Sequence, residues 1–336
     1  MKKSRRRVVV VTGASAGVGR AATQAFAREG ARIALIARGR AGLNGARRDV
    51  ENLGGEALVL PLDVADAGAV ENAAQKIEEK FGAIDVWVNN AMASVFSPIT
   101  GMTAEEFKRV TEVTYLGYVY GTLAALRRML PRNRGLIIQV GSALAYRGIP
   151  LQSAYCAAKH AIQGFVDSLR CELIHDKSRV RVTMIDLPAL NTPQFSWVKS
   201  RLPRKAQPVP PIFQPEIAAE AIVHASHYPR REIYVGMPTV GAIVVDKFFP
   251  GLLDHYLART GYDSQQHDGA EDRHRPDNLW EPVDAKKDYG AHGHFDSRAA
   301  RHSPQLWTSM HRGLIAAGAL VLGGALLANF LWRDKD

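Results

Sequence analysis

Over its first 190 residues the chain alternates between short apolar runs and longer stretches whose apolar residues recur at helical spacing. The apolar runs are continuous, which is typical of parallel strands buried on both faces. Strands are predicted over residues 7–13, 31–37, 56–62, 84–91, 135–142 and 180–188. Helices are predicted over residues 17–29, 40–53, 67–81, 103–130 and 152–176. This alternation predicts an α/β fold: a Rossmann-type, doubly wound parallel sheet in three αβα layers, built from right-handed βαβ units.

The pattern changes after residue 190. The stretch "PRKAQPVPPIFQP", residues 203–215, is rich in proline and predicts a loop. A helix over 215–227 and a strand over 232–236 are expected to complete the sheet. Beyond about residue 261 the chain is polar and aperiodic, which predicts a largely unstructured linker. The predicted parts are a basic arm (1–6), a catalytic domain (7–260), a linker (261–312), an apolar segment (313–332) and a tail (333–336).

The apolar segment, "GLIAAGALVLGGALLANFLW", contains no charged side chain. Twenty helical residues extend over about 30 Å, the thickness of the hydrocarbon core of a bilayer. Arg312 precedes the segment, Arg333 and Lys335 follow it, and Trp332 lies where interfacial aromatic residues occur. A buried core helix is the alternative, but such helices keep a polar stripe that this segment lacks. A C-terminal transmembrane helix is therefore predicted.

Lysine and arginine number 43 against 33 acidic residues, and the net charge is +10. Such a balance suits nucleic acid or an anionic membrane as a partner. No aromatic residue alternates with the basic start, "MKKSRRR", so nucleic acid is not expected. The apolar run behind this start is too short for a signal peptide. We therefore expect a solvated arm or a contact with anionic lipid, and a catalytic domain in the cytoplasm that a single C-terminal span holds to a membrane.

The segment "TGASAGVGR", residues 12–20, joins the first predicted strand to the first predicted helix. Glycines in such a place allow a tight turn, close approach of a ligand to the backbone and close packing of the helix on the sheet. The start of the helix presents unpaired N–H groups and a partial positive charge, which suit a pyrophosphate. The strand–turn–helix setting therefore predicts a dinucleotide site at Gly13, Gly17 and Gly19.

The spacing TGxxxGxG resembles that of the short-chain dehydrogenase/reductase family, in its short form. Ser142, followed by Tyr155 and Lys159 in "YCAAK", carries the same resemblance, which covers about residues 7–240. It implies a Rossmann-type domain that binds a nicotinamide cofactor and forms a homodimer or homotetramer through the helices predicted at 103–130 and 152–176.

Three further motifs are similar to cofactor motifs of that family: "LDV" at 62–64, "NNAM" at 89–92 and "LPALNTP" at 187–193. Met92 and Ala189 stand where the family usually has glycine. The resemblance implies that the following residues bind the cofactor: Gly13, Ser15, Gly17, Val18, Gly19, Arg38, Asp63, Val64, Asn90, Ala91, Tyr155, Lys159, Pro188 and Thr192.

The second predicted strand ends in Ala37 and Arg38, where the resemblance places the adenosine ribose. In NAD-binding members an acidic residue usually occupies the position of Ala37, where it accepts a bond from the 2′-hydroxyl and repels a 2′-phosphate. Here a guanidinium follows instead, which suits a phosphate dianion, with Arg20 as a possible support. NADP(H) is therefore favoured over NAD(H). The alternative is that Arg38 is an ordinary surface arginine.

Reduction of a carbonyl group requires a hydride at carbon and a proton at oxygen. Tyr155 and Lys159 are four residues apart, so they share one face of a helix. The ordinary tyrosine pKa of about 10 is high for proton exchange at neutral pH, and a nearby ammonium is expected to lower it. The resemblance implies that Tyr155 is the acid/base, that Lys159 activates it and binds the nicotinamide ribose, and that Ser142 holds the substrate oxygen.

Thr114 stands where the family usually has an asparagine that helps to hold a water in the proton relay. We count it as a doubtful member of the catalytic set. The sequence favours an NADP(H)-dependent oxidoreductase that interconverts a carbonyl and an alcohol. The alternative, motivated by Thr114 and Met92, is a membrane-tethered NADP(H)-binding regulatory or scaffold protein with little turnover.

The segment after residue 192 is expected to form the substrate lid, and its Phe195 and Trp197 favour a lipophilic small-molecule substrate. The motif "HGHFD", residues 292–296, has no second cluster of ligands placed to complete a metal site, so no metal is expected.

Overall fold

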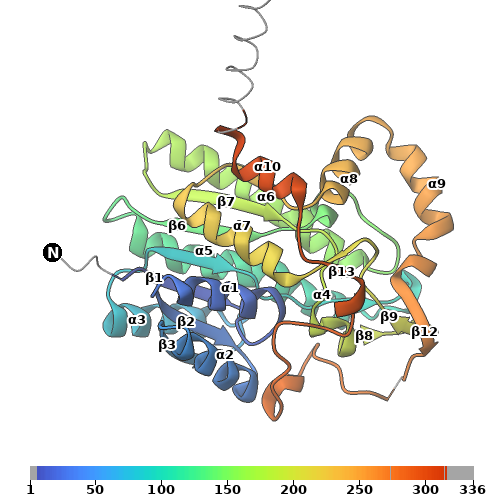
Figure 1. The fold of residues 1–336 in the computed structure, drawn as a ribbon, viewed down its shortest axis with the longest axis horizontal. Helices are drawn as coiled ribbons and strands as arrows, with labels where there is room; N and C mark the ends of the chain where they lie inside the picture. The colour runs from blue at the N-terminus through green and yellow to red at the C-terminus, as the bar shows by residue number, and fades with distance from the viewer. Residues whose placement is uncertain (1–5, 273, 314, 316–336) are drawn as a thin grey trace, which may run out of the picture.

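The computed structural model describes residues 6–272, 274–313 and 315 (Figure 1). Its centre is a seven-stranded sheet in the order β11-β7-β6-β4-β1-β2-β3, in which every neighbouring pair is parallel. The strands are β1 (Val8–Thr12), β2 (Arg32–Ala37), β3 (Glu56–Pro61), β4 (Val86–Asn89), β6 (Leu136–Val140), β7 (Arg181–Asp186) and β11 (Glu232–Tyr234). The Rossmann-type sheet expected from the apolar runs is confirmed.

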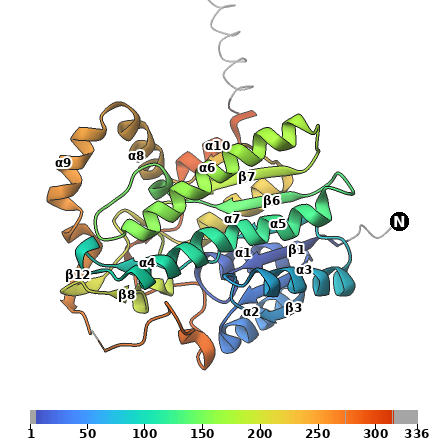
Figure 2. The ribbon, with the colours of Figure 1, turned by 180° about the vertical axis from the view of Figure 1, so that it is seen from behind.

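Helices cover both faces of this sheet (Figures 1 and 2). One face carries α1 (Gly17–Arg28), α2 (Arg40–Asn52) and α7 (Pro215–His227). The opposite face carries α3 (Ala67–Phe81), α4 (Ala104–Thr111), α5 (Gly117–Met129) and α6 (Ser153–His175). In β1, Val9 and Val11 pack into the first layer, whereas Val8 and Val10 pack into the second. Double burial is the reason that this strand is a continuous apolar run.

The strand order reverses between β1 and β4, because the chain winds outward from β1 to β2 on one side and from β4 to β6 on the other. In an open parallel sheet a ligand crevice forms outside the carboxyl ends of the strands at such a point. The segments that follow β1, β4, β6 and β7 therefore meet at one edge of the sheet.

The single helix predicted over 103–130 is interrupted. Between α4 and α5 lies one π-helical turn, Glu112–Leu116. Within this turn the Thr114 hydroxyl donates to the carbonyl oxygen of Ala93 at 2.8 Å and accepts from the Ala93 N–H at 3.0 Å. The prediction of one continuous helix over 103–130 is therefore wrong at this turn.

Smaller elements surround the sheet. Two helices, α8 (Met237–Phe248) and α9 (Pro250–Thr260), form a projecting pair at one end of the molecule (Figure 1). The others are β5 (Val95–Phe96), β8 (Lys199–Ser200), β9 (Arg204–Ala206), β10 (Ile212–Phe213), β12 (Gln266–Ala270), β13 (Ala299–Ala300), α10 (Pro304–Met310) and single 3-10 turns at Ile99–Gly101, Ala143–Ala145, Pro193–Ser196, Asp263–Gln265, Val283–Ala285 and Asp296–Arg298.

The expectation of a largely unstructured linker over 261–312 differs from the structure. Here β12 pairs with β9 and β13 pairs with β10. The sparse apolar side chains of this segment, such as Leu279 and Leu306, are fully buried against the domain. The segment is extended and its polar groups bond to the domain, so neither periodicity nor high apolar content marks it as ordered. We call residues 278–296 the C-terminal strap.

The apolar segment 313–332 lies outside the described residues except for residues 313 and 315. Within the part of the chain that is described, no helix combines the length and the apolar character that crossing a bilayer requires.

Candidate active site

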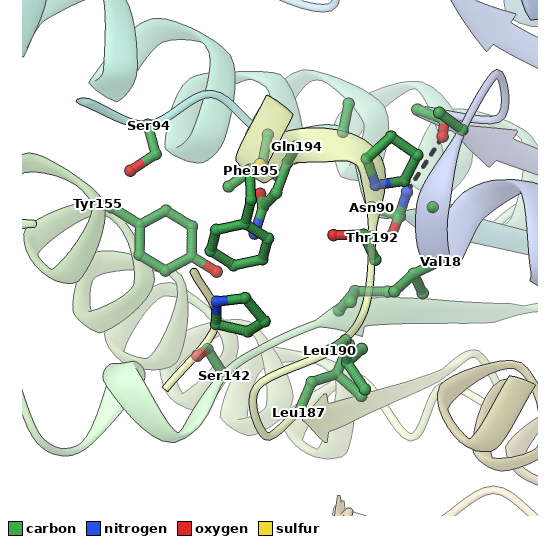
Figure 3. A pocket seen from close by; sticks show the side chains of 18 of the residues that line it. Val18, Asn90, Ser94, Ser142, Tyr155, Leu187, Leu190, Thr192, Gln194 and Phe195 are labelled. Atoms are coloured by element: carbon green, nitrogen blue, oxygen red, sulfur yellow. Dashed lines mark hydrogen bonds between the residues drawn. The ribbon is translucent and has the colours of Figure 1, made fainter. Parts of the chain in front are cut away.

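A cavity of about 430 Å³ opens at the carboxyl edge of the sheet (Figure 3). It brings together most of the residues that the sequence singled out, although they come from separate segments of the chain. They are Gly13, Ser15, Gly17, Val18, Arg38, Asp63, Val64, Asn90, Ala91, Ser142, Tyr155, Lys159, Pro188 and Thr192. Gly19 and Thr114, which the sequence also singled out, are not part of this lining.

The glycines of the loop after β1 have two different structural roles. Gly13 has a φ of +66°, and a Cβ built on it would lie 2.9 Å from the Ala91 Cα. A Cβ built on Gly19 would lie 2.1 Å from the carbonyl oxygen of Gly13. Gly19 therefore allows α1 to pack on the loop, whereas Gly13 and Gly17 line the cavity itself. The helix α1 begins after Ala16, whose side chain provides no cap. The N–H of Gly17 donates to the carbonyl oxygen of Gly290 in the strap at 3.1 Å, so an anion at the start of this helix has to replace that bond.

Ser142 and Tyr155 lie at the other end of the cavity (Figure 3). Ser142 follows β6, and its hydroxyl accepts a bond from the Leu144 N–H at 3.1 Å. Tyr155 lies in the first turn of α6. Burial raises the pKa of Tyr155 above its usual range, and its hydrogen bond with Ser142 opposes that shift. The two hydroxyls can therefore face one substrate oxygen.

Lys159 lies one turn further along α6 and is only 2% exposed. Its ammonium donates to the Val140 carbonyl oxygen at 2.7 Å and to the Tyr118 hydroxyl at 3.1 Å. Burial lowers the pKa of Lys159 to about 7, while the negative charge of Asp186 acts in the opposite direction.

We expected the Lys159 ammonium to lower the Tyr155 pKa, and the structure differs. The Lys159 Nζ lies 5.5 Å from the centre of the Tyr155 ring, and its hydrogen bonds go to other partners. Desolvation controls both groups: it raises the pKa of the tyrosine and lowers that of the lysine.

At the opposite end of the cavity lie the groups expected to meet adenosine. Arg38 donates to the backbone carbonyl oxygens of three strap residues, Asn278, Leu279 and Trp280. Asp63 forms an ion pair with Arg109.

Arg20 does not face the position expected for a phosphate. It is buried and forms ion pairs with Asp49 at 2.8 Å and with Asp288 at 3.1 Å. Arg20 therefore joins α1 to α2 and to the C-terminal strap.

The model of the short chain dehydrogenase family matches residues 7–201. The chain belongs to the short-chain dehydrogenase family. An uncharacterized oxidoreductase of Bacillus subtilis, YxnA, is 32% identical over 327 residues, which covers 96% of this chain and 90% of that protein. This dehydrogenase is therefore an NAD(P)-dependent oxidoreductase.

This dehydrogenase is also similar to a reductase in sequence and to a solved alcohol dehydrogenase in structure. A fatty acyl-CoA reductase of Acinetobacter baylyi is 30% identical, over 65% of this chain and 72% of that protein. An alcohol dehydrogenase of the archaeon Thermococcus sibiricus, solved in complex with 5-hydroxy-NADP, superposes with a TM-score of 0.58 at 28% identity. That match covers 68% of this chain and 96% of the archaeal one.

Thr114 bonds to a neighbouring segment of the backbone and does not line the cavity of this dehydrogenase. Its hydroxyl is occupied by both backbone groups of Ala93, so the side chain holds the segment after β4 against the π-helical turn. Thr114, the doubtful member of the predicted catalytic set, therefore has a hydroxyl that is bonded to Ala93 and does not face the cavity lining.

Two buried residues of the site were missed by the sequence analysis. The Tyr118 hydroxyl accepts from Lys159 and donates to the Val140 carbonyl oxygen at 3.0 Å. Asp186 ends β7, and burial raises its pKa well above the usual range, with Glu232 adding to the shift and Lys159 opposing it. A polar residue at the end of an apolar strand, as in "VTMID", was the available signal for Asp186.

The segment expected to form the lid after residue 192 lines the cavity through Phe195, Trp197 and the prolines at 208 and 210. Phe195 lies near Tyr155 (Figure 3), whereas Trp197 packs against the strap, with its ring centre 4.9 Å from that of Tyr289. Phe195 packs edge-on against Phe96, with ring centres 6.2 Å apart. This end of the cavity is therefore predominantly apolar and aromatic.

Proposed function

We propose that this dehydrogenase interconverts a carbonyl group and an alcohol with Tyr155 as the acid/base. The observation that carries the proposal is that Ser142, Tyr155 and Lys159 share one cavity with the glycine-rich loop. The residues present suit a nicotinamide dinucleotide, because Gly13 and Gly17 line the cavity beside the start of α1, where a pyrophosphate would replace the Gly290 carbonyl oxygen as the partner of the Gly17 N–H.

When bound, the nicotinamide cofactor donates or accepts the hydride. In the direction of reduction, Ser142 donates a hydrogen bond to the substrate carbonyl oxygen and orients it. Tyr155 gives its proton to that oxygen as negative charge develops there. Lys159, with a pKa of about 7, exchanges protons readily at neutral pH and holds a positive charge beside the reacting groups when it is protonated.

NADP(H) is our proposed cofactor. Arg38 lies at the carboxyl end of β2 and lines the cavity, so its guanidinium can reach a 2′-phosphate there. The archaeal relative in complex with 5-hydroxy-NADP supports this choice. The bonds from Arg38 to the strap compete with such a contact, and their consequence is developed below.

The proposed substrate is lipophilic. Aromatic and aliphatic side chains line the substrate end of the cavity, among them Phe96, Ile149 and Phe195. The similarity to a fatty acyl-CoA reductase supports a long apolar substrate. Pro238 and Ala242 of α8 also line the cavity. The adjoining α8–α9 pair exposes large apolar side chains: Met237, Val244, Phe248, Phe249, Leu252 and Tyr256.

A membrane setting is likewise a proposal, with the segment 313–332 as the anchor and the catalytic domain in the cytoplasm. The uncharged twenty-residue sequence of that segment and the exposed apolar side chains of α8 and α9 support it.

The test is oxidation of NADPH by the full chain in the presence of a panel of aliphatic, aromatic and lipid-derived carbonyl compounds. We expect turnover with apolar substrates and a loss of at least about a hundredfold in kcat for Tyr155→Phe, because general acid catalysis contributes about that much or more. The control is Tyr120→Phe, a tyrosine of α5 that does not line the cavity.

Unchanged turnover in Tyr155→Phe would sink the mechanism. Binding of NADPH without turnover on any substrate would instead favour the second candidate, a dinucleotide-binding scaffold, which the departure at Thr114 motivates.

A further inference from the structure

The C-terminal strap bonds to two arginines at the adenosine end of the cavity, Arg38 and Arg109. Arg38 donates to the carbonyl oxygen of Trp280 at 2.8 Å, and to those of the two preceding residues. Arg109, which is paired with Asp63, donates from its Nε to the Leu279 carbonyl oxygen at 3.0 Å. The Leu279 side chain is fully buried. This part of the strap is therefore docked into the adenosine end of the site.

The same strap places a carboxylate beside Arg38. Asp284 lines the cavity and is only 8% exposed. A Cβ built on Gly39 would lie 1.7 Å from the Asp284 Oδ1, and one built on Gly42 would lie 2.5 Å from its Oδ2 and 2.9 Å from the Ser15 Cβ. The carboxylate thus lies over the start of α2, next to the glycine-rich loop, and its charge acts on Arg38.

We propose that the strap is a second determinant of cofactor choice, in which Asp284 opposes Arg38 at the adenosine 2′ position. The inference rests on the dinucleotide site proposed above. A carboxylate repels a phosphate dianion in a buried site, where screening is weak. The same carboxylate can accept a hydrogen bond from a ribose hydroxyl.

Arg38 favours the phosphate of NADP(H), but three carbonyl oxygens already share its donors. A 2′-phosphate must displace some of these bonds and is repelled by Asp284, whereas a 2′-hydroxyl needs no bond from Arg38 and can donate to the Asp284 carboxylate. Strand β2 ends in Ala37 and carries no acidic residue there, so the strap supplies a carboxylate from more than 240 residues away in the sequence. The wild-type protein consequently discriminates between NADP(H) and NAD(H) less than Arg38 alone would dictate.

The experiment is equilibrium binding of NADPH and NADH to the full chain, followed by the fluorescence of the reduced nicotinamide. For each variant the measured quantity is the ratio of the Kd for NADH to the Kd for NADPH. We expect Asp284→Asn to raise this ratio by about tenfold, chiefly through tighter NADPH binding, because it removes one nearby negative charge. Asp284→Glu, which keeps the charge, should leave the ratio close to that of the wild type.

Asp263→Asn is the matched control, because it removes the same charge from an 82% exposed side chain that does not line the cavity. A ratio in Asp284→Asn equal to that of the wild type or of this control would overturn the proposal. Asp284→Ser provides the same comparison if the asparagine variant does not fold.

Arg38→Ala separates this proposal from the proposed function. A lower ratio in Arg38→Ala, together with an unchanged ratio in Asp284→Asn, overturns the role of the strap alone. An unchanged ratio in Arg38→Ala overturns the assignment of Arg38 to the 2′-phosphate. Absence of binding of either dinucleotide to the wild type overturns the dinucleotide site itself and the strap's role with it.

Discussion

At the scale of the residue, the chemistry of the site depends on how far its groups are removed from water. Lys159 is buried and Tyr155 is half-buried at the cavity wall, and desolvation disfavours the charged form of each. Their spacing in "YCAAK" is readable from the sequence, but the carbonyl of Val140 and the hydroxyl of Tyr118 that receive the Lys159 bonds are not. These partners belong to β6 and α5, and they lie next to α6 only in the folded protein.

The lowered pKa of Lys159 predicts a dependence of stability on pH. Its folded pKa is about 7, whereas an unfolded lysine titrates near about 10.4. Between these values the unfolded chain binds the proton and the folded chain does not, so the free energy of unfolding rises with pH. Below about pH 7 both states are protonated, and the contribution stays constant.

We therefore expect Lys159→Met to reduce the rise in stability between about pH 7 and pH 9, by up to about 1.4 kcal/mol per pH unit. Urea unfolding at several pH values in this range measures it. Lys108→Met is the control, because the Lys108 side chain is 76% exposed. Parallel pH profiles for the wild type and Lys159→Met would contradict the assignment.

At the scale of the element, the helix predicted as one piece is divided by the π-helical turn Glu112–Leu116. The predicted ranges of the seven sheet strands agree with the structure to within a few residues. Strands are recognisable because burial on both faces demands apolar side chains at every position. The sequence analysis missed the interruption, and the bonds that hold this turn join Thr114 to Ala93, 21 residues away in the sequence.

Replacement of Thr114 by valine tests whether this residue acts through structure or through catalysis. The variant keeps the shape but loses both bonds to Ala93 and leaves buried backbone groups unsatisfied. We expect it to lower the free energy of unfolding by about 1–3 kcal/mol, as measured in urea. Thr114→Ser, which keeps the hydroxyl, should retain most of that stability.

A role in proton transfer makes a different prediction for Thr114→Val. A loss of more than about a hundredfold in kcat with unchanged stability would show that the hydroxyl takes part in catalysis.

At the scale of the whole molecule, the C-terminal segment is part of the folded domain, which extends well beyond residue 260. Residues 261–312 were expected to form a linker, and instead they bury Leu279, Phe295 and Leu306 against the domain. The strap also supplies Asp288 to Arg20. A polar composition predicts disorder only where a segment has no partner surface, and here the domain provides one.

Two truncations test this arrangement. A chain ending at residue 312 should keep the stability of the domain. One ending at residue 260 should lose about 5 kcal/mol, chiefly because the three large buried side chains of Leu279, Phe295 and Leu306 are removed. Thermal unfolding of the two chains measures the difference, and equal melting temperatures would contradict it.

The chain ending at residue 312 should also be absent from the membrane pellet after centrifugation. Its retention in the pellet in high salt would count against the anchor at 313–332.

The homodimer or homotetramer implied by the family resemblance also belongs to this scale and stays a prediction. The mass of the chain ending at residue 312, measured by light scattering, tests it without interference from the apolar segment.

The sequence by itself determined the parallel sheet, the glycine-rich loop and the set Ser142, Tyr155 and Lys159. Each of these features restricts residue type locally. Strands buried on both faces need continuous apolar runs, a positive φ favours glycine, and residues four apart share one helix face. The tertiary structure alone decided which groups face Arg38 and Lys159, and that the strap with Asp284 reaches the adenosine end of the cavity. Contacts between segments hundreds of residues apart leave no local pattern, because each partner needs only a carbonyl, a hydroxyl or a single charge.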